Sequence, residues 1–156
     1  AYLPERIAID KSLRAEKIID FYQDFYPNFN VPRAYDMLSR LGIAPDMKLK
    51  TMSKGMLEKV QLILTMARDA DLYLLDEPIA GVDPAARDYI LGTILSCANP
   101  SSTILLSTHL IYDIEPILTD AIFLRQGQIM IAGDANAIRN DKGMSLDGLF
   151  REVFRC

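Results

Sequence analysis

Apolar residues in the first part of the chain recur every three or four positions, which is the spacing of amphipathic helices. Ser12 precedes the first of these runs and is the expected cap of a helix. Gly42 lies where a glycine commonly follows a helix C-terminus. The pattern predicts three helices, over about 12–26, 32–41 and 54–67.

The pattern then changes to short apolar runs separated by helical segments. Residues 71–75 and 103–107 are almost wholly apolar, which is typical of strands buried on both faces of a parallel sheet. Asp83 and Pro84 favour the cap and first positions of a helix that runs to about Cys97. The remaining expected elements are a helix from about 110 interrupted near 116, strands over 121–124 and 129–132 joined by a turn at 126–128, and short helices over 135–139 and 145–154.

Strands separated by helices predict an α/β fold with a parallel or mixed sheet, which places its ligand site at the carboxyl ends of the strands. Asp76 and Glu77 follow the first apolar strand directly, and Thr108 and His109 follow the second. We therefore expect these four polar groups at one edge of the sheet.

Composition and charge exclude some classes of function. The chain has 156 residues, the size of one ordinary domain, and a net charge of −4, which argues against a nucleic-acid partner. Its apolar runs are shorter than the roughly 18–20 residues needed to span a bilayer. Cys97 and Cys156 are far apart without metal-type spacing, so both are expected to be reduced thiols of a cytosolic protein.

Two short segments carry the candidate chemistry. Asp76 and Glu77 end an apolar strand; the first is suited to Mg²⁺, and the second to orienting or deprotonating an attacking water. The alternative is a strand followed by a solvated turn. Ser53, with free backbone N–H groups at a helix start, predicts an anion site, and the alternative is an ordinary capped helix. A lone histidine is more often structural than catalytic, but the place of His109 at the end of a strand favours a functional role.

Taken in order, these segments resemble the motifs of ATP-binding-cassette (ABC) ATPases, over nearly the whole chain. Residues 52–56 are similar to the signature motif, with Ser53 and Gly55 retained and Met52, Lys54 and Met56 departing from it. The other matches are residues 72–77 to Walker B, 80–83 to the D-loop, 107–109 to the H-loop, and 2–5 to the Q-loop with Glu5 in place of glutamine. The sequence is most similar to the ATPase subunits of bacterial ABC-2-type exporters.

The phosphate-binding pattern G-x-x-x-x-G-K-[ST] of Walker A does not occur in these residues, and in the family it precedes the Q-loop. The resemblance implies a truncated part of a P-loop NTPase-like α/β domain, inactive by itself. Its expected parts are the Q-loop and helical signature subdomain (1–70), the Walker B, D-loop and H-loop part of the core (71–133), and C-terminal helices (134–156).

The resemblance also implies a role for each motif residue in Mg²⁺-dependent ATP hydrolysis between two head-to-tail ATPase subunits. Glu77 is the expected general base, His109 contacts the γ-phosphate, and Asp76 holds the metal. Asp83 bridges the two subunits. The expected nucleotide-contacting residues are Glu5, Ser53, Lys54, Gly55 and Met56.

The implied function is to energise transport as the cytoplasmic ATPase subunit of an ABC transporter, bound to a transmembrane subunit at the inner face of the cell membrane. Most of an aromatic cluster over 21–29 is expected to be core, with one or two aromatics exposed for that partner. One alternative is a non-catalytic interaction module that keeps the transporter-contacting helices. Another is a soluble ABC ATPase of DNA repair or translation, which would bring long insertions or a second cassette.

Overall fold

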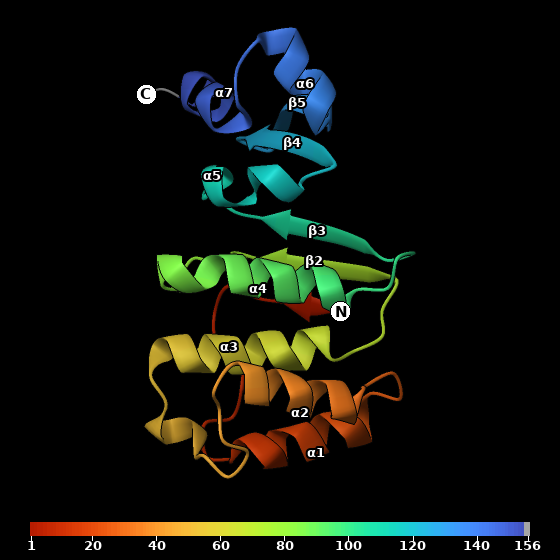
Figure 1. Cartoon of the computed structure of the whole chain (residues 1–156), viewed down its shortest axis with the longest axis vertical. Coiled ribbons are helices and arrows are strands. Elements are labelled where there is room, and N and C mark those ends of the chain that lie inside the picture. Colours follow the sequence, from red (N-terminus) through yellow and green to blue (C-terminus); the bar gives the residue numbers. More distant parts are fainter. Residues whose placement is uncertain (155–156) are drawn as a thin grey trace. The chain divides into compact units, whose positions relative to one another are not determined.

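The computed structural model describes residues 1–154, apart from the side chains of Ala85 and Ala86. Its contacts divide the chain into two compact units, one from Ala1 to Thr108 and one from His109 onward (Figure 1). The three-part division expected from the motifs stays a prediction. Cys97 is a free thiol, whereas Cys156 lies outside the described residues. Among the described helices, none is long and apolar enough to cross a bilayer.

A helical layer forms one part of the first unit. Helices α1 (Ala15–Phe25) and α2 (Val31–Arg40) pack against each other and against α3 (Lys54–Met66), as Figure 1 shows. Gly42 follows α2 with a φ of 68°, a left-handed conformation that glycine adopts without steric cost. The prediction of α2 with its terminal glycine and of α3 after Ser53 is confirmed.

Helix α1 begins later than predicted, and the expectation that Ser12 caps it is wrong. The backbone N–H of Ser12 instead donates to the Asp10 carboxylate at 2.9 Å, a local turn that competes with helix formation. The first helical N–H groups, those of Ala15 and Glu16, donate to the carbonyls of residues 47 and 45 at 3.0 and 2.8 Å. Tertiary contacts therefore replace the side-chain cap, and the sequence around Ser12 does not reveal them.

The aromatic cluster is more exposed than predicted. Phe21 and Phe25 are 50% and 67% exposed and stack with ring centroids 4.9 Å apart. The other three aromatics, Tyr22, Tyr26 and Phe29, are half-buried. The prediction that most of the cluster is core is wrong, because the buried face of α1 is filled by residues 15, 18 and 19.

A three-stranded parallel sheet forms the other part of the first unit. Its order is β1 (Tyr2–Leu3), β2 (Leu72–Asp76), β3 (Thr103–Ser107), and the register aligns Asp76 with Ser107. Helix α4 (Pro84–Cys97) lies between β2 and β3 in the chain and begins at the predicted proline. The strand ends that carry the acids and the hydroxyls thus meet at one edge of the sheet, as predicted.

Only one face of this sheet is covered. Tyr73 and Leu75 are buried, whereas Leu72, Leu74 and Leu105 are 45%, 37% and 54% exposed. The expectation that the strands are buried on both faces is therefore wrong for the described residues. An apolar run in a sequence indicates that both faces suit burial, but it does not say which elements cover them.

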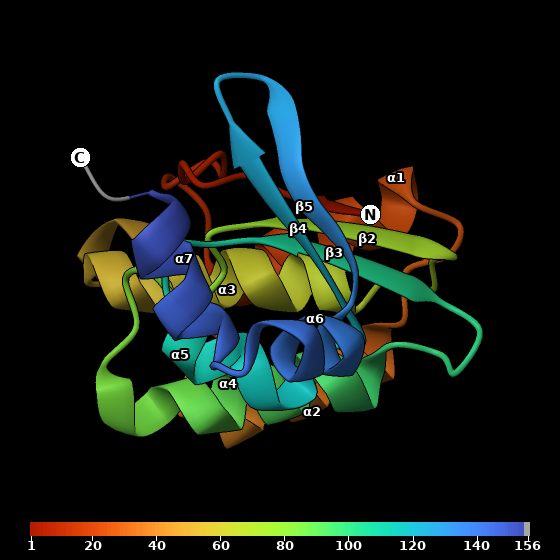
Figure 2. The same cartoon turned by 90° about the horizontal axis from the view of Figure 1, so that it is seen from above.

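The second unit is built on an antiparallel hairpin of β4 (Asp120–Arg125) and β5 (Gln128–Asp134). Figure 2 shows the hairpin as a long ribbon whose turn lies away from the unit's helices. Those helices are α5 (Ile111–Ile114), the 3₁₀ turn η2 (Glu115–Ile117), α6 (Ala135–Lys142) and α7 (Leu146–Val153). The unit's core is Ile111, Ala121, Phe123, Ala135, Leu146 and Leu149.

Glu115 holds the start of α7 in place. Its two carboxylate oxygens accept the backbone N–H groups of Leu146 and Asp147 at 2.9 and 3.2 Å, and Arg139 donates to one of them at 3.3 Å. Burial by itself raises the pKa of Glu115, but the hydrogen bonds from Leu146, Asp147 and Arg139 outweigh burial and lower that pKa. The ionised carboxylate therefore stabilises the folded second unit.

Glu115→Gln is expected to lower the free energy of unfolding by about 1–3 kcal/mol at neutral pH. Because the folded-state pKa is lowered, the stabilisation is present above the unfolded-state pKa of about 4.3 and is lost as pH falls through the folded-state pKa. Thermal unfolding of both proteins from neutral to acidic pH should show the two curves converging at acidic pH. Glu152→Gln, which alters an exposed carboxylate of α7, is the control, and a constant gap at all pH values would contradict the prediction.

Candidate functional site

Two carboxylates at the end of β2 are fixed by hydroxyls at the end of β3. Asp76 Oδ1 accepts a hydrogen bond from Ser107 Oγ at 2.6 Å, and Glu77 Oε2 accepts one from Thr108 Oγ1 at 2.9 Å. The parallel register produces both contacts, since it sets Asp76 beside Ser107. Both acids are therefore held at the sheet edge, half-buried and each oriented by its own hydroxyl partner.

The backbone at Glu77 is in a conformation that side chains rarely adopt. Its φ is 48°, in the left-handed region, which costs an ordinary residue about 1–2 kcal/mol. The backbone N–H of Glu77 donates to the carbonyl of Ser107 at 2.9 Å, which ties this strained turn to β3. Strain of this kind gathers at functional sites, where the surrounding structure holds a side chain in a required direction.

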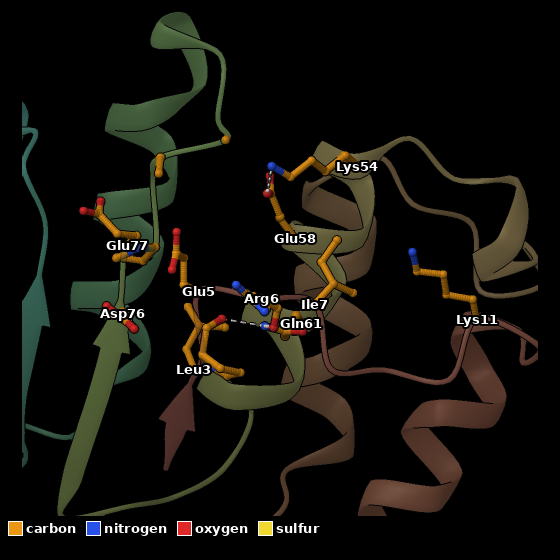
Figure 3. Close-up of a pocket in the computed structure, with 14 residues that line it drawn as sticks. Leu3, Glu5, Arg6, Ile7, Lys11, Lys54, Glu58, Gln61, Asp76 and Glu77 are labelled. Atoms are coloured by element: carbon orange, nitrogen blue, oxygen red, sulfur yellow. Dashed lines mark hydrogen bonds and ion pairs between the residues drawn. The ribbon is translucent and has the colours of Figure 1, made fainter.

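A cavity of about 400 Å³ opens beside the two acids. Four residues singled out from the sequence line it: Glu5, Lys54, Asp76 and Glu77. Figure 3 shows Glu5 between the strand-end acids on one side and Arg6 with Gln61 on the other. The lining residues that sequence reasoning missed include Arg6, Lys11, Glu58 and Gln61, whereas Gly81 belongs to the segment matched to the D-loop.

The start of α3 carries the predicted anion-binding features. Ser53 Oγ accepts the backbone N–H of Met56 at 3.3 Å, so the serine caps the helix as predicted. Lys54 is 80% exposed, and its Nζ lies 3.6 Å from Glu58 Oε1. Ser53, Gly55 and Met56 share this helix start but are not among the residues that line the cavity.

Asp83 and His109 lie outside the cavity lining as well. Asp83 is exposed and immediately precedes α4, and His109 is the exposed first residue of the second unit. Their roles at the subunit interface and at the γ-phosphate stay predictions.

The loop that follows Glu77 packs closely on α3. A Cβ at Gly81 would overlap the end of the Glu58 side chain, which would have to turn aside. Glu58 Oε2 is buried and has no hydrogen-bond partner among the described residues. Gly81 and Glu58 therefore form a tight contact between the loop and the helix.

Gly81→Ala is expected to destabilise the protein by about 0.5–1 kcal/mol, because the flexible Glu58 side chain must take a less favourable rotamer to make room. In a Glu58→Ala background the same substitution should cost less than about 0.5 kcal/mol, since the obstructing atoms are gone. Denaturant unfolding of the two single variants and the double variant measures this coupling. An equal cost of Gly81→Ala in both backgrounds would rule out the proposed contact.

The sequence contains signals for one of the missed residues and for the pairing of the strand-end acids with the hydroxyls. The hydroxyls of Ser107 and Thr108 could be paired with Asp76 and Glu77 by aligning the two apolar strands end to end. Gln61 is a polar residue inside an otherwise apolar helical run, which is an unusual place for an amide. Arg6 and Lys11 carry no such signal.

The chain is similar to a family model, to curated proteins and to solved structures. Residues 7–112 match the family model described as "AAA domain, putative AbiEii toxin, Type IV TA system". An uncharacterised ABC transporter ATP-binding protein of Synechocystis is 28% identical over 91% of this chain, and the energy-coupling factor transporter ATP-binding protein EcfA2 of Staphylococcus saprophyticus is 34% identical over 66%. A solved ATP-binding subunit of an ABC transporter, 28% identical, superposes over 99% of this chain and 68% of its own with a TM-score of 0.86.

The chain belongs to the ABC transporter ATP-binding proteins. Its α/β architecture, with a helical part followed by a parallel sheet and flanking helices, is the ABC ATPase fold predicted from the motifs. The chain spans 42% and 39% of the lengths of the Synechocystis protein and of EcfA2.

Proposed function

We propose that this chain is the part of an ABC transporter ATPase that carries the signature motif and Walker B. The intact protein would hydrolyse ATP to ADP and phosphate and so energise transport across the membrane. The observation that carries this proposal is the pair of acids at 76 and 77, held by hydroxyls at the edge of a cavity that Glu5 and Lys54 also line. Such a site can bind a cation, orient a water and face a phosphate.

The carboxylate of Asp76 fits the metal that this chemistry uses. Mg²⁺ prefers hard oxygen ligands, keeps several waters and takes one or two carboxylates together with phosphate oxygens. Asp76 offers such an oxygen at the end of a rigid strand, and its hydrogen bond from Ser107 fixes the orientation of the carboxylate. When bound, the metal would neutralise charge on the phosphate oxygens.

Glu77 is the proposed general base. Its carboxylate is held by Thr108, and its strained backbone fixes the direction in which the side chain leaves the strand. Accepting a proton from an attacking water is the step that this group would perform. His109 follows Thr108 directly and is the proposed contact to the γ-phosphate.

The start of α3 is proposed to serve the ATP of a second subunit. Lys54 lines the cavity beside Asp76 and Glu77, whereas Ser53, Gly55 and Met56 do not, and these three residues support a separate use of this helix start. Its backbone N–H groups and the exposed Lys54 would bind phosphate oxygens presented by the partner. In a head-to-tail dimer each site would then combine the acids of one subunit with the helix start of the other, with Asp83 bridging the two.

A transmembrane transporter subunit is the proposed second partner, which would hold the protein at the cytoplasmic face of the membrane. The stacked rings of Phe21 and Phe25 form an exposed apolar surface on α1, a feature that commonly marks a docking site. We expect Phe21→Ser with Phe25→Ser to lower the unfolding temperature by no more than about 4 °C, because the rings are 50% and 67% exposed and lie outside the buried face of α1. The same change should weaken recovery of the transmembrane subunit in detergent pull-down at least about tenfold. Undiminished recovery would contradict this assignment.

Residues 1–156 by themselves are proposed to be inactive. The exposed apolar face of Leu72, Leu74 and Leu105 and the partial coverage of the relatives both support a larger domain that contributes the phosphate-binding loop. The test is Mg²⁺-dependent ATP hydrolysis by the full-length protein, compared with residues 1–156. Hydrolysis by the full-length protein alone supports the proposal, and no ATP binding by either would favour the non-catalytic interaction module.

A further inference from the structure

One amide side chain is buried within the apolar helix α3. Gln61 is 6% exposed and, with Thr65, makes up the buried polar side chains of the described residues. Burying an amide is unfavourable unless its polar atoms are hydrogen-bonded. An apolar residue would fill the same space without that cost, so the contacts of Gln61 need an explanation beyond packing.

Gln61 binds three backbone groups of one loop. Its Nε2 donates to the carbonyls of Pro4 and Arg6 at 2.9 and 3.3 Å, and its Oε1 accepts the N–H of Ala8 at 2.7 Å. Two acceptors and one donor in the loop thus meet two donors and one acceptor in the amide, which also fixes the orientation of the amide. Alternate residues of the loop are held, and the side chains of Glu5 and Arg6 line the cavity (Figure 3).

The N-terminus of α3 is the candidate anion site. Ser53 caps the helix, and Gln61 lies about two turns further along the same rigid element. The loop over residues 4–8 is irregular, and the three backbone groups described above have one side chain as their partner. A displacement of α3 would therefore carry Glu5 and Arg6 with it.

We infer that Gln61 is a positioning residue for ATP hydrolysis: it sets where Glu5 and Arg6 stand at the cavity and couples them to the helix that begins at Ser53. This role rests on the proposed ATPase function. Gln61 also lines the cavity, but its amide is hydrogen-bonded to the three backbone groups of the loop, and it acts through them.

The test uses the full-length protein with Gln61→Met, which keeps the side-chain size and removes all three hydrogen bonds. Hydrogen–deuterium exchange of a peptide covering residues 4–8 should become about tenfold faster, since local opening loses these bonds. The kcat for ATP hydrolysis should fall about tenfold, with the Kd for ATP within about twofold. Gln61→Glu keeps only the acceptor for Ala8 and sets a carboxylate oxygen against two carbonyls, so it should behave like Gln61→Met.

Ile63→Val is the matched control, because Ile63 is buried in the same helix and makes none of these contacts. It should leave kcat and the exchange of residues 4–8 unchanged. Equal exchange in Gln61→Met and Ile63→Val would overturn the inference, as would an unchanged kcat in Gln61→Met beside an active wild type. A wild type that does not hydrolyse ATP would instead contradict the proposed function itself, and with it this role.

Discussion

Glu77→Gln is expected to lower the rate of ATP hydrolysis by the full-length protein about 10²–10⁴-fold. The amide keeps the size of the side chain but does not accept a proton from water at neutral pH. The affinity for ATP should stay within about twofold, because Glu77 is proposed to act on the water and not to bind the nucleotide. The fold should also persist, since Thr108 can donate to the amide oxygen as it does to Oε2 of Glu77.

The measurement is steady-state phosphate release, combined with equilibrium binding of a fluorescent ATP analogue. Glu16→Gln makes the same chemical change on α1, away from the strand ends, and should retain the wild-type rate. If Glu77→Gln kept more than about a tenth of the wild-type rate, another group would be the base. A parallel loss of ATP binding would instead assign Glu77 to the nucleotide or metal site.

Gly55→Asp is expected to reduce the rate of ATP hydrolysis about 10²–10³-fold. Losing one preorganised group that stabilises negative charge in a transition state has an effect of this size. The new carboxylate would lie at the helix start proposed to bind the partner's phosphate. A Cβ at Gly55 would lie 3.7 Å from the carbonyl oxygen of Gly81, an ordinary contact, so a side chain can begin at this position without a clash. An aspartate in the first helical turn is also favourable toward the helix dipole.

The unfolding temperature of Gly55→Asp should therefore equal or exceed that of the wild type, while activity is lost. Gly55→Ala separates size from charge and should keep most of the activity with similar stability. Calorimetry measures the stability, and phosphate release the activity, of the wild type, Gly55→Ala and Gly55→Asp. If Gly55→Asp were destabilised, the loss of activity would reflect misfolding. If Gly55→Asp were active, the start of α3 would not bind the phosphate.

Much of the fold could be predicted because its determinants are local. Ser53 as a cap, Gly42 after α2 and Pro84 at the start of α4 are each sufficient to set a helix boundary, and the structure has those boundaries. The acids at 76 and 77 follow an apolar run, so their place at the sheet edge could be inferred from the strand direction alone.

The features that could not be predicted depend on which distant segments meet. The start of α1 is set by carbonyls of residues 45 and 47 and not by Ser12. The two-residue strand β1 is too short to give a periodic pattern, and it exists through its pairing with β2. The exposure of Leu72 and Leu105 depends on what covers the second face of the sheet, which the strand sequences do not specify.

Mixing the two inactive variants tests whether each ATP site combines the acids of one subunit with the helix start of another. In a mixed dimer of Glu77→Gln and Gly55→Asp, one site carries both defects. The other site combines the intact Glu77 of one chain with the intact Gly55 of its partner. Random mixing makes half of the dimers mixed with one intact site each, so about a quarter of the wild-type rate should return. A mixture as inactive as either variant alone would contradict the account.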